Sequence, residues 1–268
     1  MTTHAPIDDR AAATDSADAI RLYSLAWACH DFDVRSNHDS AYWDFRRNRT
    51  GAFSLSDEEH RERLIKLLNR WRCRLTDKKR LSERLHTWGK NKRNASSLRS
   101  FRTGLLHVDE KRFRHVAKLY DRLKVVGGEH FGAAATAKTL FAINPAVFPP
   151  WDEAIRADRG VTDDGAGYVE YMRWVKRQLT CLTENAAHFG IRPRLIAQRI
   201  GHPHPQCVTL VKLVDEYMWA TVIRPSKDRS AKRWCAPRAE KLREWLRWSR
   251  RGTIRGSHPI RRRRQGAT

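Results

Sequence analysis

One proline-rich stretch of the sequence delivers a single carboxylate. Residues 142–160 read AINPAVFPPWDEAIRADRG, with the prolines placed just ahead of Trp151 and Asp152. Because proline fixes φ and lacks a backbone donor, this stretch must end the preceding helix and cross in an extended form. A carboxylate held at the edge of a basic cleft can act as a general base or stabilise a developing cation. The alternative interpretation is that Asp152 only caps a helix that contains Ile155 and Arg156.

The helix expected over residues 132–142 offers a second kind of chemistry at its start. Gly132 precedes first turns that carry only Ala and Thr, and such small side chains let a phosphate come close. Free N–H groups at a helix N-terminus attract anions without help from any side chain. We therefore predict that Gly132, Thr136, Lys138 and Arg156 contact a nucleic-acid backbone near Asp152.

The charge balance of the chain indicates a polyanionic partner. Its 53 Lys and Arg residues against 30 Asp and Glu give a formal charge of +23. Residues 224–268 alone hold 16 basic and 3 acidic residues, and a basic tail grips phosphates independently of sequence. The predicted tail contacts are Arg261, Arg262, Arg263 and Arg264.

A second basic segment, WGKNKRNASS, combines cations with an aromatic residue. It is predicted to be a loop in which Trp88 stacks on a base while Lys90, Lys92 and Arg93 follow the backbone. The alternative is a solvated loop without a ligand.

Several other chemistries find no pattern in the sequence. It has no phosphate-binding loop, dinucleotide fingerprint or nucleophile elbow. The five cysteines form no CxxC pair, and the short HPH segment has no partner cluster, so we expect no metal and no cofactor. A metal held by Asp152 with Asp215 or Glu216 is the one open alternative.

Hydrophobic spacing predicts an all-α protein. The clearest helix start is SLSDEEHRERLIKLLNRW, where Ser56 is expected to be the N-cap with Glu59 completing a capping box. Further helical patterns recur to about residue 223, and alternating strand patterns are almost absent. We predict a disordered leader over 1–18, a helical domain over 19–223, and a basic helix with a disordered tail over 224–268.

The segment from Gly132 to the FPPWD turn resembles the helix–hairpin–helix DNA glycosylase superfamily. In that family a hairpin of the type LPGVGxKTA is followed by an apolar-Pro-x-Asp turn with the catalytic aspartate. The resemblance places the second hairpin glycine at Gly132, the first at His130 and the aspartate at Asp152. Ala134 stands where bifunctional members have a lysine nucleophile, so the resemblance implies a monofunctional enzyme that uses water.

Three segments are similar to a widespread, uncharacterised family of bacterial proteins. LLNRWRCRL (67–75) is similar to its FLNxWGCRI, AKTLFAINPAVFPPWDEAIR (137–156) to its ASKILHFLxPxLFxxWDxxI, and LVKLVDEYMW (210–219) to its xxKLLDEYxW. The similarity carries no activity, but it implies that Lys138, Trp151, Asp152 and Asp215 belong to a recurring design.

Together these observations predict a cytoplasmic, nucleoid-associated protein whose partner is nucleic acid, with duplex DNA favoured, and not a membrane. The expected activity is removal of a flipped damaged or modified base at Asp152. A non-enzymatic nucleic-acid-binding module of a mobile element or defence locus, and a metal-dependent nuclease, are the alternatives. The sequence leaves the oligomeric state open.

Overall fold

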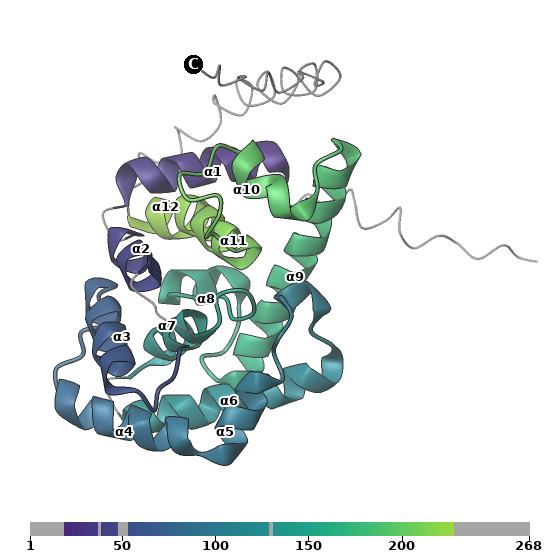
Figure 1. Cartoon of the computed structure of the whole chain (residues 1–268). Helices are drawn as coiled ribbons and strands as arrows, with labels where there is room; N and C mark the ends of the chain where they lie inside the picture. The colour runs from purple at the N-terminus through teal and green to yellow at the C-terminus, as the bar shows by residue number, and fades with distance from the viewer. Residues whose placement is uncertain (1–18, 37–38, 48–52, 129–130, 228–268) are drawn as a thin grey trace, which may run out of the picture.

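Helices form every regular element in the part of the chain that the computed structural model describes, namely residues 19–36, 39–47, 53–128 and 131–227 (Figure 1). The prediction of an all-α protein is therefore confirmed. None of these helices is both long enough and apolar enough to cross a membrane.

The elements follow one another in a simple order. The first six helices are α1 (Leu22–Arg35), α2 (Asp39–Arg47), α3 (Glu58–Arg70), α4 (Lys78–Lys90), α5 (Lys92–Arg99) and α6 (Glu110–Gly127). The next five are α7 (Ala133–Ile143), α8 (Glu153–Arg159), α9 (Gly165–His188), α10 (Ile196–Arg199) and α11 (Leu210–Met218). Short elements complete the set: the 3₁₀ turns η1 (Leu105–His107) and η2 (Pro193–Leu195), the π turn η3 (Trp219–Ile223), and α12 (Arg224–Lys227).

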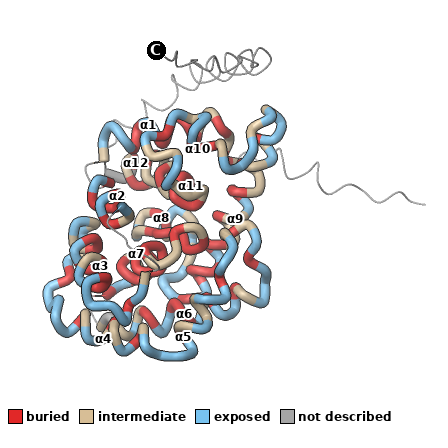
Figure 2. Tube along the Cα trace, in the orientation of Figure 1, coloured by how far each residue is buried: buried red, intermediate tan, exposed pale blue. Residues whose placement is uncertain are grey.

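Helix α7 lies at the centre of the molecule, with α3, α6 and α8 around it (Figures 1 and 2). Its residues are apolar or small on nearly every side, and eight of its eleven are buried. A helix that is hydrophobic all round belongs in a protein interior. The sequence AAATAKTLFAI therefore explains the central position of α7.

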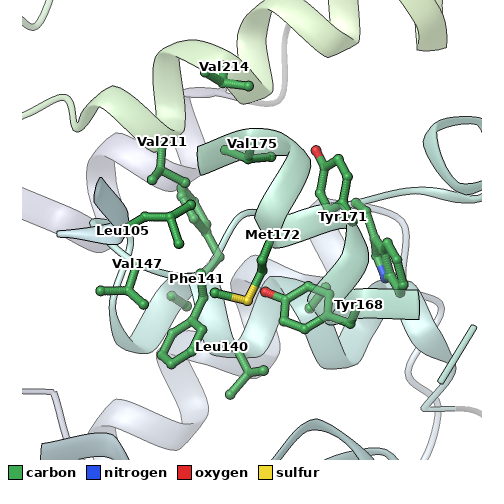
Figure 3. Packing of buried hydrophobic residues seen from close by; sticks show 14 of the residues in the cluster. Leu105, Leu140, Phe141, Val147, Tyr168, Tyr171, Met172, Val175, Val211 and Val214 are labelled. Atoms are coloured by element: carbon green, nitrogen blue, oxygen red, sulfur yellow. The ribbon is translucent and has the colours of Figure 1, made fainter. Parts of the chain in front are cut away.

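The core extends from α7 to α9 and α11 (Figure 3). Leu140 and Phe141 of α7 meet Tyr168 and Met172 of α9, and all four side chains are almost completely buried. Val211 lies on the other side of this layer, on α11. The long apolar stripe of α9 thus joins the turn after α7 to the C-terminal helices.

Two local predictions need correction. Helix α3 is capped by Asp57, whose Oδ1 accepts a hydrogen bond from the N–H of His60 at 3.0 Å, and not by Ser56. Asp and Ser are equally favourable N-cap residues, and the observed N-cap lies one residue after the predicted one. The segment from residue 88 to 97 is not a loop, because α4 runs through Trp88 and α5 begins at Lys92.

The last described helix, α12, lies past residue 223. Arg224 begins α12, and its guanidinium forms an ion pair with the completely buried carboxylate of Asp31 on α1. The predicted leader, residues 1–18, and the tail from residue 228 onward lie outside the described residues.

Candidate functional site

The turn that carries Asp152 is held by hydrogen bonds from buried aromatic side chains. Trp151 Nε1 and Tyr120 Oη both donate to the carbonyl of Ala133, at 3.1 and 3.0 Å. The hydroxyl groups of Tyr168 and Tyr171 donate to the carbonyls of the two prolines, Pro149 and Pro150, at 2.9 and 3.4 Å. Proline has no backbone N–H to donate, so the turn cannot be held by the backbone hydrogen bonds of a helix or a sheet. The hydrogen bonds from these aromatic side chains to its carbonyl groups fix the turn instead.

Asp152 occupies the N-cap position of α8, but its side chain makes no capping hydrogen bond. Its Oδ1 instead lies 2.6 Å from Nζ of Lys138 on α7. The Asp152 side chain is 35% exposed, and no described residue donates a hydrogen bond to Oδ2. Asp152 therefore stands at the predicted cap position without a side-chain capping bond, and its carboxylate is partly exposed.

Lys138 is protonated at neutral pH. Its side chain is only 12% exposed, and its Nζ also approaches the carbonyl of Trp71 at 3.4 Å. Burial lowers the pKa of Lys138, but Asp152, with smaller contributions from Cys73 and Asp215, more than offsets this effect, so the pKa is raised. A protonated lysine cannot act as a nucleophile, and its ammonium group holds the Asp152 carboxylate in place through the ion pair.

The residues that cover Lys138 form an unusual turn at the end of α3. Arg72 and Arg74 have φ values of 61° and 53°, in the left-handed region that L-residues seldom adopt. Asn69 holds this turn, since its amide accepts from Leu75 N at 2.7 Å and donates to Leu75 O at 3.2 Å.

Cys73 faces the ion pair from the same turn. Burial raises the pKa of its thiol, although the nearby Lys138 lowers it. The group is therefore a neutral thiol at neutral pH, and it is not an activated nucleophile.

A second charged cluster surrounds Lys212 on α11, whose side chain is 2% exposed. Its Nζ lies 2.9 Å from Asp215, 3.3 Å from Asp39 and 3.6 Å from Glu216. Glu216 also pairs with His202 at 3.2 Å. The two acids considered as metal ligands thus surround a buried ammonium group, and no metal-binding group of three His, Cys, Asp or Glu side chains occurs among the described residues.

The two clusters act on each other through a thin aromatic layer. Burial raises the pKa of Asp215, and the charge of Asp152 raises it further, while Asp215 in turn raises the pKa of Lys138. The ring of Tyr42 lies between them, stacked on Trp71 at 5.8 Å and 5.6 Å from Nζ of Lys212. Residues from the segments 67–75, 137–156 and 210–219 therefore lie close together in the fold.

The residues predicted to contact phosphate differ in their exposure to solvent. Gly132 is exposed at the start of α7, with no atom near the place of a Cβ. Thr136 is completely buried and donates its hydroxyl to the carbonyl of Gly132 at 3.1 Å, so its predicted contact with DNA is incompatible with this structure. Arg156 is half-buried, with its guanidinium 5.7 Å from the ring of Trp151.

The predicted stacking residue Trp88 faces the core. It is 3% exposed on α4, so it has no free ring face for a base. Lys90, Lys92 and Arg93 are exposed where α4 meets α5, and their contact with a nucleic acid stays a prediction. Arg261, Arg262, Arg263 and Arg264 lie outside the described residues.

Sequence reasoning missed Lys212, Arg72 and Arg74. Lys212 interrupts the apolar stripe of its helix and stands three and four residues before two acids, a spacing that places the charges on one face and indicates a buried pairing. The left-handed turn had no such signal, since arginine is not a residue that marks positive φ. Comparison with protein-family models, with curated proteins and with solved structures finds no match to this chain.

Proposed function

We propose that this chain is a nucleic-acid-binding protein that releases a base hydrolytically at Asp152, in the manner of a monofunctional DNA glycosylase. The observation that carries the proposal is the state of the Asp152 carboxylate. Its side chain makes no capping hydrogen bond, one of its oxygens is paired with Lys138, and the side chain as a whole is 35% exposed.

Such a carboxylate suits the chemistry of N-glycosidic bond cleavage. As the bond between C1′ and the base nitrogen breaks, the sugar gains oxocarbenium character and the base leaves with the bonding electron pair. A fixed anion stabilises this developing cation, and it can accept a proton from the water whose oxygen adds to C1′. The departing base takes up a proton from solvent and leaves as a neutral molecule.

The surroundings of Asp152 support the monofunctional form of this reaction. Lys138 is held as an ammonium group by Asp152, so its proposed role is to fix the position of the carboxylate. Ala134 occupies the position where a lysine nucleophile would be expected from the resemblance to helix–hairpin–helix glycosylases. Water is then the nucleophile, and no covalent enzyme intermediate forms.

A non-enzymatic nucleic-acid-binding module is the second candidate. One observation favours it, namely that Asp152 already has a cationic partner at 2.6 Å, as a purely structural ion pair would. Both candidates share the charge of the chain and the exposed N-terminus of α7, so only chemistry separates them.

The test treats plasmid and duplexes that carry damaged or modified bases with the protein, followed by alkali. Alkali-dependent strand breaks are expected with the natural chain, and Asp152→Asn should abolish them. Asp158→Asn is the matched control, because Asp158 lies on the same helix but is exposed and paired with Arg159. Binding without base release supports the module, and direct breaks that require magnesium support a nuclease.

A further inference from the structure

An unpaired basic surface surrounds the turn between α3 and α4. We call it the 66–80 basic surface, and its cations are Lys66, Arg70, Arg72, Arg74, Lys78, Lys79 and Arg80. All seven are exposed, and none forms an ion pair with another described residue. The single acid in this span, Asp77, is used as the N-cap of α4. Repulsion among so many unpaired cations destabilises the folded chain, and a bound polyanion would relieve it.

A groove begins at this surface. It runs between α3 and α4, has a volume of about 1050 Å³, and is bordered at one end by Lys66, Arg70, Lys78 and Lys79. The rest of its lining includes Ile65, Ser82 and the carboxylates of Glu58, Glu62 and Glu83. Its one other arginine, Arg61, is buried and already bonded to Ser82 and to the carbonyl of Leu55. Phosphates are therefore favoured at the basic end alone, while the remainder offers apolar contact and hydrogen-bond acceptors.

We propose that the 66–80 basic surface binds the phosphodiester backbone of a single-stranded nucleic acid, with bases directed into the α3–α4 groove. Helices that pack together have axes about 8–10 Å apart, so the groove between them is narrower than a duplex, whose major groove alone is about 12 Å wide. A basic groove that tracks one backbone is the general design of proteins that bind single strands. Carboxylates such as Glu62 can accept hydrogen bonds from base amino groups.

The position of this surface ties it to the Asp152 site. The turn that carries Arg72 and Arg74 also places the Trp71 carbonyl 3.4 Å from Lys138, the partner of Asp152. A strand held by the two arginines passes directly beside that ion pair. This step rests on the proposed function, because it makes the single strand the form in which a base reaches Asp152.

The decisive variant is Arg72→Gly combined with Arg74→Gly. Both positions have positive φ, a conformation that glycine adopts without strain. The change therefore removes two guanidinium groups while preserving the turn. Binding of a fluorescein-labelled single strand of about 16 nucleotides should weaken about tenfold at moderate salt. The slope of log affinity against log salt should also decrease by about 1.4, because each lost phosphate contact removes about 0.7.

The matched control removes two arginines elsewhere. Arg192→Gln with Arg194→Gln makes the same change in net charge at η2, far from α3, and should leave affinity and slope nearly unchanged. Lys78→Gln with Lys79→Gln tests the same surface without touching the turn, in case the glycine variant misfolds. Equal losses in the control and glycine variants would overturn the proposal, as would stronger binding of a duplex of the same length that responds in the same way.

The outcomes stay separate from those of the proposed function. Single-strand binding that depends on Arg72 and Arg74, without base release, would support the proposed binding surface and contradict the glycosylase activity. Base release that does not depend on either arginine would support the glycosylase activity and contradict the proposed binding surface.

Discussion

The Nζ atom of Lys138 lies 2.6 Å from Oδ1 of Asp152, and this ion pair joins the central helix α7 to the start of α8. The contact changes the meaning of the proline-rich turn. Its prolines and aromatic anchors do not merely end one helix and begin another. They present a carboxylate to a lysine that comes from the helix before the turn.

The first prediction concerns the strength of this pair. A double-mutant cycle of Asp152→Asn and Lys138→Met should give a coupling free energy of about 1–2 kcal/mol, measured by urea unfolding. The value lies above that of an exposed pair because the Lys138 side chain is 12% exposed, and below that of a fully buried pair because Asp152 is 35% exposed. A coupling near zero would show that the pair is broken in solution.

The second prediction concerns the Lys212 cluster. Lys212→Met should lower the free energy of unfolding by about 3–5 kcal/mol, since it leaves three carboxylates close together without a counter-charge. Asp215→Asn should cost less, because Lys212 retains Asp39 and Glu216. Chemical denaturation of both variants checks the order, and a milder loss for Lys212→Met than for Asp215→Asn would contradict it.

The sequence alone predicts the long helices, but it does not predict how the side chains of the candidate site are arranged. Spacing of apolar residues predicts the long helices α6 and α9, because burial of one face dictates their register. The direction of the Asp152 side chain depends instead on where α7 lies relative to the turn, and local sequence prefers a cap at that position. Trp88 shows the same limit, since a tryptophan among lysines suggests a binding loop until its partners in the core are known.

The third prediction tests the corrected position of Trp88. Trp88→Ala should lower the free energy of unfolding by about 3–5 kcal/mol, because it opens a cavity between buried side chains. Trp88→Phe should cost far less, since the indole nitrogen has no hydrogen-bond partner among the described residues. Neither variant should change nucleic-acid affinity under conditions where it is folded. A selective loss of affinity would restore the stacking role.

The fourth prediction is a loss of stability at alkaline pH. Burial raises the pKa of Tyr168 and Tyr171 well above 10.0. The pKa of Lys138 is raised above 10.5, because nearby groups, chiefly Asp152, together outweigh the effect of burial. The folded chain therefore holds these protons at a pH where the unfolded chain has lost them. Their stabilisation is complete below about pH 10 and declines as pH rises, by about 1.4 kcal/mol per pH unit for each group.

Denaturant unfolding as a function of pH checks this dependence, together with tyrosinate absorbance. The buried tyrosines should ionise only as the chain unfolds. Tyr171→Phe should flatten the alkaline decline, because it removes one of the groups that produce it. A native titration of these hydroxyl groups near pH 10, without unfolding, would contradict the burial on which the prediction depends.

The last prediction separates stability from affinity at the N-terminus of α7. Gly132 is the N-cap, with φ of −67° and open space where a side chain would begin. Gly132→Asp should therefore raise the free energy of unfolding by about 0.5 kcal/mol, since aspartate caps the free N–H groups and suits the helix dipole. The same carboxylate would repel a phosphate, so nucleic-acid affinity should fall. Gly132→Ser is the control, because it caps the helix without adding charge and should reduce affinity less. If Gly132→Asp stabilises the fold and leaves binding intact, the phosphate contact at this helix end is absent.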